Sequence, residues 1–252
     1  MAKIIAVANQ KGGVGKTTTT VNLCAALSAM GKRVLLVDCD PQGNASSGMG
    51  VRKGTRPNSY DLLVNGVPAV DCAVHTKHGD VISANKELAA ASVELIGREK
   101  REYVLKNALL TLYSDYDTIF IDCPPSLELL TVNALAAADS VLIPMQCEYY
   151  ALEGIADLMT SIKMTKRRLN RRLEVEGIVL TMYDARARLT EQVAGELRKH
   201  LGDKVYETVI PRSVRLSEAP SHGLPGVVYD KINKGSRAYM ALAEEFLERQ
   251  EH

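Results

Sequence analysis

A glycine-rich loop near the start of the chain has the residue types that bind phosphate groups. The loop reads Lys11-Gly12-Gly13-Val14-Gly15-Lys16-Thr17-Thr18, between an apolar run at Ile4–Ala8 and a helical pattern. Glycines let backbone N–H groups converge on phosphate oxygens, and the positive end of the helix dipole adds to this attraction. Lys16 can reach the β and γ phosphates, and the Thr17 hydroxyl can complete the shell of a Mg²⁺ ion. A strand, this loop and a helix in succession predict an ATP site with Mg²⁺.

The loop departs from the general phosphate-binding pattern at its beginning. The pattern G-x-x-x-x-G-K-[ST] has glycine where this chain has Gln10, and a second lysine follows at Lys11. A lysine so close to the phosphates does not fold back onto its own nucleotide as well as Lys16 does. Lys11 therefore either reaches a nucleotide held by a second copy of the chain or is a solvated surface lysine.

Aspartates follow two further apolar runs. Asp122 ends the run Thr118–Ile121, so we expect it at the carboxyl edge of a parallel sheet, where ligands bind in such folds. Asp38 and Asp40 end the run Val34–Val37. Asp40 can orient a water for attack on the γ phosphate, and Asp38 can serve the metal shell. The predicted metal residues are Thr17, Asp40 and Asp122. For each aspartate the alternative is a capping or turn bond at the end of a strand.

Short apolar runs alternate with helical patterns along the chain. The runs are continuous rather than alternating in polarity, as expected for parallel strands covered by helices on both faces. The predicted strands are Ile4–Ala8, Val34–Val37, Thr118–Ile121, Val141–Pro144, Gly177–Met182 and Val205–Ile210. The predicted helices are Thr17–Met30, Leu129–Ala138, Glu153–Leu169, Thr190–Leu201 and Ser236–Arg249. This order predicts a doubly wound α/β fold with a mostly parallel sheet. We expect one domain over residues 1–252, with Val51–Gly79 as a less regular surface excursion.

The composition is that of a globular protein, with 46% apolar and 24% charged residues. The five cysteines form no C-x-x-C pair, which is typical of reduced thiols. No apolar run approaches the roughly 18 residues that cross a bilayer, and the first residues leave no room for a signal peptide. We therefore expect a soluble, cytoplasmic protein. The net charge of +1 is uneven, because Thr160–Arg215 holds 13 Lys/Arg against 7 Asp/Glu. This basic stretch is the candidate for nucleic-acid contact.

Four segments together resemble the ParA/Soj chromosome- and plasmid-partitioning ATPases, which are P-loop NTPases with a deviant Walker A loop. The segments are K-G-G-V-G-K-T-T, D-C-D-P-Q-G-N, F-I-D-C-P-P-S and I-P-R-S-V-R-L-S-E-A-P-S-H-G, and the match runs from Met1 to about Leu247. The resemblance implies that Lys11 crosses an ATP-sandwich dimer, that Asp40 is the switch I aspartate needed for hydrolysis and that Asp122 belongs to switch II. It also implies that Lys16, Thr17 and Thr18 contact the phosphates and Mg²⁺. The implied adenine-lining strip is Pro211-Arg212-Ser213.

The resemblance also implies a function. An ATP-bound homodimer binds double-stranded DNA without sequence preference through Arg186 and Arg215. A ParB-type partner accelerates slow hydrolysis, and the cycle segregates chromosomes or plasmids on the nucleoid without membrane contact. The basic cluster Lys163–Arg172 is either a further DNA contact or a solvated helix face.

Two alternative functions stay open. One is a ParA-family ATPase that positions a cargo other than DNA, since such relatives share these motifs. The other is a MinD-like membrane-cycling ATPase, which needs a basic amphipathic C-terminal helix. The segment Glu244–His252 is acidic instead, which disfavours the second alternative.

Overall fold

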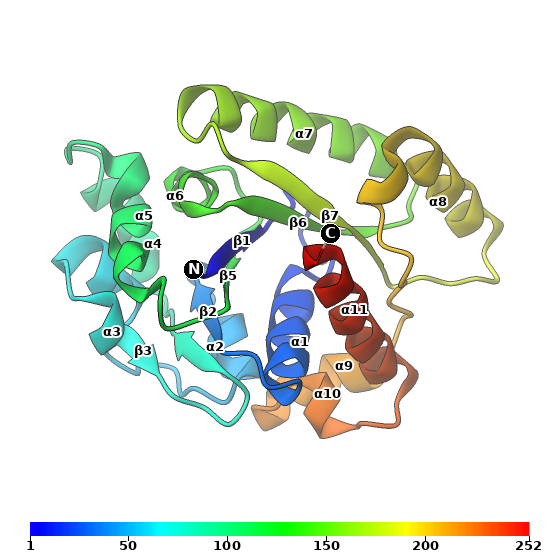
Figure 1. Cartoon of the computed structure of the whole chain (residues 1–252), viewed down its shortest axis with the longest axis horizontal. Coiled ribbons are helices and arrows are strands. Elements are labelled where there is room, and N and C mark those ends of the chain that lie inside the picture. Colours follow the sequence, from blue (N-terminus) through cyan, green and yellow to red (C-terminus); the bar gives the residue numbers. More distant parts are fainter. Residues whose placement is uncertain (252) are drawn as a thin grey trace.

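The sheet is doubly wound, as the sequence predicts. The computed structural model describes residues 1–251, and there the strands form one sheet in the order β3-β4-β2-β5-β1-β6-β7 (Figure 1). The strands are β1 (Lys3–Val7), β2 (Val34–Asp38), β3 (Ala73–Val74), β4 (Asp80–Ile82), β5 (Thr118–Asp122), β6 (Ser140–Gln146) and β7 (Glu174–Thr181). Neighbouring strands are parallel except β3 and β4, which are antiparallel. The carboxyl ends of β1, β2 and β5 therefore meet at one edge, where the predicted loop and aspartates follow.

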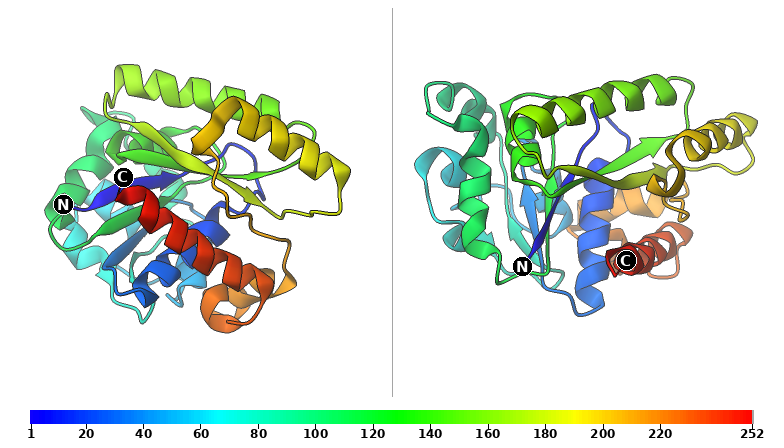
Figure 2. Two further views of the ribbon diagram at one scale, coloured as in Figure 1. Left: turned by 45° about the vertical axis from the view of Figure 1, so that its right-hand side comes forward. Right: turned by 45° about the horizontal axis from the view of Figure 1, so that its top comes forward.

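Helices cover both faces of the sheet, and Figure 2 shows α7 on one side and α1 with α11 on the other. One apolar core lies between the sheet and α1 (Lys16–Ala29), α2 (Asn44–Gly48), α9 (Val214–Glu218), α10 (Gly226–Tyr229) and α11 (Lys234–Gln250). The other core involves α3 (Ala69–Cys72), α4 (Leu88–Glu94), α5 (Val104–Leu109), α6 (Leu129–Ala137), α7 (Ala151–Arg168) and α8 (Arg188–Leu201). Ile4 and Ile5, successive residues of β1, point into opposite cores, and both are fully buried. Burial on both faces explains why the strands are continuous apolar runs.

Glycines set both ends of α1. Gly15 precedes the helix with φ 90°, and Gly31 follows it with φ 81°. Both values lie in the left-handed region, which glycine enters without the steric cost that a Cβ atom would add. The chain can therefore turn sharply from the phosphate loop into α1 and out again toward β2.

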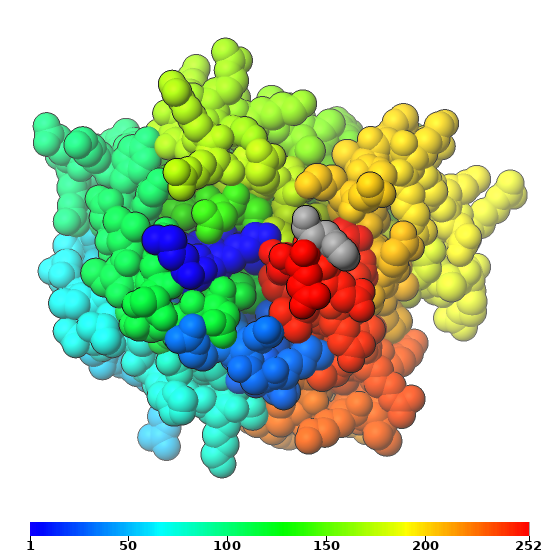
Figure 3. Space-filling view, in the orientation of Figure 1, coloured from blue at the N-terminus to red at the C-terminus, as the bar shows by residue number. Residues whose placement is uncertain are grey.

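The start of the chain lies beside the C-terminal helix, as the blue and red surfaces in Figure 3 show. Lys3 in β1 forms an ion pair of 2.7 Å with Glu176 in β7 and a hydrogen bond with Gln250 in α11. Lys3 opens β1, so this contact lies at the edge of the sheet opposite the phosphate loop. It anchors the end of α11 far from the candidate site.

The segment Val205–Ile210 is not a strand, although the sequence predicts one. It has an isolated bridge between Val205 and Ile178, and the amide of Ile210 donates to the Leu180 carbonyl at 2.8 Å. Val205, Tyr206 and Ile210 are nevertheless buried. The apolar pattern therefore reflects burial beside β7, which sequence periodicity does not distinguish from a strand.

The segment Val51–Gly79 is only in part a surface excursion, because several of its residues are packed into the fold. Asn58, Ser59, Leu63 and Cys72 are fully buried. The Ser59 hydroxyl donates to the Asp38 carbonyl at 2.6 Å, which attaches the segment to the end of β2. The sequence did not predict this packing, because short helical turns and the two-residue strand β3 have no periodicity to detect.

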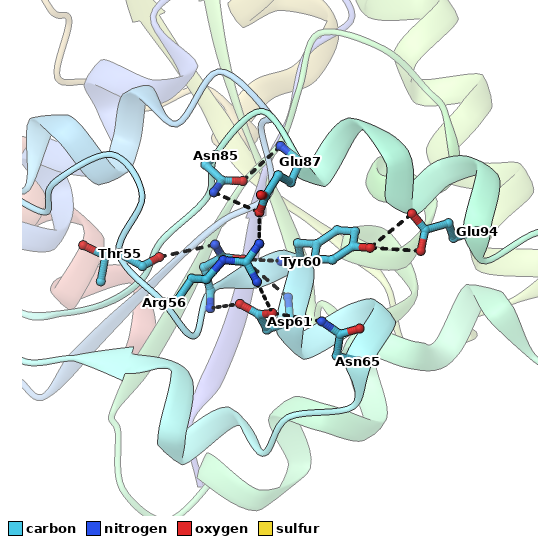
Figure 4. A network of polar contacts seen from close by, with 9 residues as sticks. Thr55, Arg56, Tyr60, Asp61, Asn65, Asn85, Glu87 and Glu94 are labelled. Atoms are coloured by element: carbon cyan, nitrogen blue, oxygen red, sulfur yellow. Dashed lines mark hydrogen bonds and ion pairs between the residues drawn. The ribbon is translucent and has the colours of Figure 1, made fainter.

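A polar network joins this segment to the loop after β4 (Figure 4). Arg56 donates to Asp61 at 2.8 Å and pairs with Glu87, and Asn65 donates to Asp61 at 2.9 Å. Asp61 is only 5% exposed, so these donors satisfy a buried carboxylate. The Tyr60 hydroxyl donates to Glu94 in α4 at 3.0 Å. The network fixes the chain that follows the Asp38–Asp40 loop.

Candidate functional site

The loop from Lys11 to Thr18 leaves β1 and enters α1 with its amide groups free. Within residues 1–251, no backbone N–H from Gly12 through Thr18 donates a hydrogen bond to the protein. Gly13 and Gly15 adopt φ values of 74° and 90°. Free N–H groups at the N-terminus of the 14-residue helix α1, in a glycine-rich turn, have the arrangement that favours a bound anion.

The ammonium group of Lys16 lies within this site. The residue is only 7% exposed, and Nζ donates to the Lys11 carbonyl at 2.9 Å. Burial lowers the pKa of Lys16, and the nearby carboxylates of Asp122 and Asp40 oppose that change. A buried cation next to free amides is stabilised by a bound anion.

Asp122 holds the hydroxyl that the sequence predicts as a metal ligand. Thr17 Oγ1 donates to Asp122 Oδ2 at 2.8 Å, and Thr20 Oγ1 donates to Oδ1 at 3.0 Å. Asp122 is fully buried, and the register of β2 and β5 sets it beside Asp38. Burial and then the Asp38 carboxylate raise the pKa of Asp122 to about 8, against the hydrogen bonds from Thr17 and Thr20. Two buried carboxylates of like charge favour a cation nearby.

Asp38 shapes the loop after β2. Its Oδ2 accepts hydrogen bonds from the amide and hydroxyl of Ser46, at 2.8 and 2.7 Å. Its Oδ1 accepts one from the Asp40 amide at 3.1 Å. Burial raises the pKa of Asp38 to about 6. Both carboxylate oxygens are thus engaged with the loop, which favours the turn-bond role over a place in the metal shell.

Asp40 is half-buried at the same edge of the sheet. Its Oδ1 accepts a hydrogen bond from the Gln42 amide at 2.9 Å. Its carboxylate is near enough to raise the pKa values of Lys16 and Asp122. Asp40 and Asp122 therefore both lie near Lys16 of the phosphate loop.

Lys11 differs from Lys16 because its side chain points outward. The Lys11 side chain is 52% exposed and forms an ion pair with Glu148, which follows β6. The Lys11 backbone amide is not one of the free amides of the loop, because it donates a hydrogen bond to Asn9 Oδ1 at 3.0 Å. The exposed ammonium group is available for contacts with another molecule.

A slot of about 100 Å³ lies between the end of β7 and the segment Pro211-Arg212-Ser213. Gly15, Thr18 and Met182 also line it, so it is contiguous with the phosphate loop. The Ser213 hydroxyl caps α9 by accepting from the Leu216 amide at 3.4 Å. The predicted adenine-lining residues thus line a slot that also borders the phosphate loop.

Arg186 and Arg215 lie on exposed segments that leave this edge of the sheet. The Arg186 side chain is 91% exposed and pairs with Asp184 at 3.2 Å. Arg215 is 53% exposed and pairs with Glu218 at 2.9 Å and Asp230 at 3.5 Å. Both guanidinium groups therefore have exchangeable surface partners.

The basic cluster Lys163–Arg172 lies elsewhere. It occupies the end of α7, an 18-residue helix of about 27 Å, and the turn into β7. Because α7 starts after the carboxyl end of β6 and returns to the start of β7, the cluster lies at the opposite edge of the sheet (Figure 1). Basic side chains in the last helical turn also stabilise the helix dipole, which supports the solvated-face interpretation.

Sequence reasoning missed four residues that contact this site: Ser46, Gln146, Glu148 and Thr181. Gln146 Nε2 donates to the Gly13 carbonyl at 3.0 Å, and Thr181 Oγ1 donates to the Val14 carbonyl at 2.7 Å. Both are polar residues at the end of an apolar strand. That signal identified Asp122 and would have identified them too.

Comparisons with known proteins identify a family and similar folds. A family model described as an AAA domain matches residues 2–175. The chain is 54% identical to the sporulation initiation inhibitor protein Soj of Bacillus subtilis, across 97% of this chain and 98% of that protein. It is 52% identical to the chromosome partitioning protein ParA of Caulobacter vibrioides, across 98% and 95% respectively. Among solved structures, cobyrinic acid a,c-diamide synthase of Mycobacterium smegmatis with bound ADP and magnesium has a TM-score of 0.87 and 35% identity, across 100% of this chain and 96% of that chain.

Proposed function

This chain belongs to the ParA/Soj family of chromosome-partitioning ATPases, and from that premise we propose that it binds and hydrolyses ATP to control DNA binding. The observation that carries the proposal is the phosphate loop. Free amides from Gly12 to Thr18 surround a buried lysine, Lys16, at the edge of the sheet where Asp40 and Asp122 lie. We infer that residues 1–252 act as a single ATPase domain.

The residues at this edge fit a Mg²⁺ ion. Within residues 1–251 no group of three or more His, Cys, Asp or Glu side chains is arranged to hold a metal alone. A Mg²⁺ that also binds phosphate oxygens needs only one or two protein ligands, and it prefers oxygen. Thr17, Asp40 and Asp122 would hold it, with Asp122 acting through the Thr17 hydroxyl or a water. The ion would neutralise charge on the phosphates and on the buried carboxylates.

Hydrolysis depends on Asp40 in this proposal. The Asp38 carboxylate and the Gln42 amide fix the turn that carries Asp40, so its carboxylate is held near Lys16. Asp40 orients the attacking water, and Lys16 with the loop amides stabilises the phosphate oxygens. We expect slow turnover without a partner, because a timing switch must persist in its ATP state.

The dimer depends on Lys11. Its ammonium group is exposed and already paired with a carboxylate on the same molecule. In the ATP state Lys11 exchanges Glu148 for the phosphates bound by a second copy, and two subunits close on two nucleotides. The exposure of Lys11 and the burial of Lys16 support this division of roles.

DNA binding follows from closure of the dimer. Arg186 and Arg215 exchange their surface carboxylates for DNA phosphates, and the dimer presents both residues twice. Doubling the phosphate contacts raises the affinity steeply and without sequence preference. A ParB-type protein accelerates hydrolysis, which releases the DNA, and the cycle takes place on the nucleoid in the cytoplasm. No helix within residues 1–251 is long and apolar enough to span a membrane.

Co-sedimentation with non-specific DNA tests the proposal. The protein should bind with Mg-ATP and not with Mg-ADP or without nucleotide. Raising salt from about 50 to about 200 mM should weaken binding about 12-fold for two phosphate contacts and about 150-fold for the four that a dimer provides. DNA binding that is indifferent to nucleotide would refute the proposal.

A further inference from the structure

Side chains at the carboxyl ends of β6 and β7 form hydrogen bonds with the phosphate loop. Gln146 and Thr181 are register partners at the carboxyl ends of these strands. Gln146 Nε2 donates to the Gly13 carbonyl at 3.0 Å, and Thr181 Oγ1 donates to the Val14 carbonyl at 2.7 Å. Two neighbouring strands thus provide one donor each for two successive carbonyls of the loop.

These hydrogen bonds set the direction of the loop amides. In a planar trans peptide the C=O and the following N–H point in opposite directions. A Gly13 carbonyl held toward β6 turns the Val14 N–H away from the sheet, and a Val14 carbonyl held toward β7 does the same for the Gly15 N–H. Both N–H groups are among those of Gly12–Thr18, which donate no hydrogen bond to the described part of the protein. The strand ends therefore keep these two donors pointed outward, where an anion can accept from them.

Thr181 is more deeply buried against the loop than Gln146 is. It is 2% exposed, and a Cβ atom at Gly15 would lie 3.6 Å from Thr181 Cγ2. Its hydroxyl is also 3.2 Å from the Met145 carbonyl. Gln146 is half-buried, and its amide also contacts Met182 Sδ at 2.7 Å. Thr181 and Met182 both line the slot that holds the predicted adenine-lining residues. Thr181 therefore contacts both the phosphate loop and this slot.

We propose that Thr181 and Gln146 are positioning residues for phosphate binding, because their hydrogen bonds to the Gly13 and Val14 carbonyls fix the orientation of the Val14 and Gly15 amides. The inference rests on the proposed ATP site. Neither side chain needs to contact the nucleotide. Loss of either hydrogen bond lets the loop peptides rotate, so ground-state binding of ATP and ADP should weaken together. The rate at saturating ATP should change little, because Asp40 and Lys16 are untouched by these substitutions.

Two substitutions at Thr181 separate hydrogen bonding from packing. Thr181→Val keeps the shape of the side chain and removes the donor, whereas Thr181→Ser keeps the donor and removes the methyl group. We expect Thr181→Val to raise the Kd for Mg-ADP and Mg-ATP by about five- to tenfold, the range of one buried hydrogen bond. Thr181→Ser should stay within about twofold of wild type. Calorimetric titration measures each Kd, and steady-state kinetics should give a raised KM with kcat within about twofold.

A merely structural role predicts a different pattern. If Thr181 only satisfies a buried carbonyl, Thr181→Val lowers the melting temperature of the nucleotide-free protein and leaves both Kd values unchanged, which would overturn the inference. If Thr181→Val does not fold, Gln146→Met tests the second contact at a half-buried position, and a Kd within about 1.5-fold of wild type would overturn it equally. Wild-type protein that binds neither nucleotide would refute the proposed ATP site itself, which keeps the two failures distinct.

Discussion

Ser46→Ala should destabilise the loop that carries Asp40 far more than the same change at the next residue. The Ser46 hydroxyl donates to the buried Asp38 carboxylate at 2.7 Å and accepts from the Ala84 amide at 2.9 Å. The residue is 1% exposed, so water cannot replace either partner. A lost hydrogen bond to a charged group costs about 1.5–3 kcal/mol, and a buried N–H without an acceptor costs about 1–3 kcal/mol. The higher helix propensity of alanine offsets about 0.5 kcal/mol of this cost, so we expect the free energy of unfolding to fall by about 3 kcal/mol.

Ser47→Ala is the matched control in the same short helix. The Ser47 hydroxyl donates only to the Gly43 carbonyl at 3.0 Å, and the residue is half-buried, so water can replace it. We expect a change within about 0.5 kcal/mol of wild type. The chain has no Trp, so urea unfolding is followed by circular dichroism at the helical band. Equal stabilities of the two variants, within about 0.5 kcal/mol, would refute the assigned role of Ser46.

Four other outcomes separate the roles of the site residues. Lys16→Ala should weaken Mg-ATP binding at least about 100-fold in calorimetry, because it removes the buried cation beside the loop amides. Asp40→Ala should retain ATP and accumulate dimers on DNA while phosphate release falls, and a monomeric, DNA-free variant with ATP bound would contradict this. Arg215→Glu should abolish co-sedimentation with DNA and preserve the dimer, whereas Arg172→Glu, the same charge change at the opposite edge, should have little effect. Without Mg²⁺ and nucleotide, stability should fall as pH rises from about 5 to about 9. Burial raises the pKa of Asp38 to about 6 and, with the Asp38 charge, that of Asp122 to about 8, so the folded state holds protons that the unfolded chain releases near pH 4. Asp122→Asn should flatten this dependence in urea unfolding, and an unchanged slope would contradict it.

The layered fold was predictable because both faces of the sheet are buried. Continuous apolar runs located β1, β2, β5, β6 and β7 to within a few residues, and the helical pattern Thr17–Met30 located α1 to within one residue at each end. The same reasoning failed where apolar residues are buried without the hydrogen-bond ladder of a β-strand, as at Val205–Ile210. It also missed β3 and β4, since strands of two and three residues carry no detectable alternation.

Sequence alone located the candidate site only in part. The loop and the aspartates stand out because each follows an apolar run directly. The partners of these residues come from distant segments: Glu148 lies 137 residues beyond Lys11, and Thr181 lies 167 residues beyond Val14. Such contacts depend on which strands become neighbours, and local pattern does not contain that information. The separation of Arg186 from the Lys163–Arg172 cluster likewise required the path of α7.

The molar mass of the protein with a non-hydrolysable ATP analogue tests the shared site most directly. Wild type, with a chain mass of 27.5 kDa, should double its mass in sedimentation velocity when the analogue and Mg²⁺ are added. Lys11→Ala should bind the analogue with a Kd within about threefold of wild type and remain monomeric, because Lys11 is exposed and Lys16 holds the phosphates of its own subunit. Lys11→Ala that dimerises as readily as wild type, or wild type that stays monomeric with the analogue bound, would contradict the account.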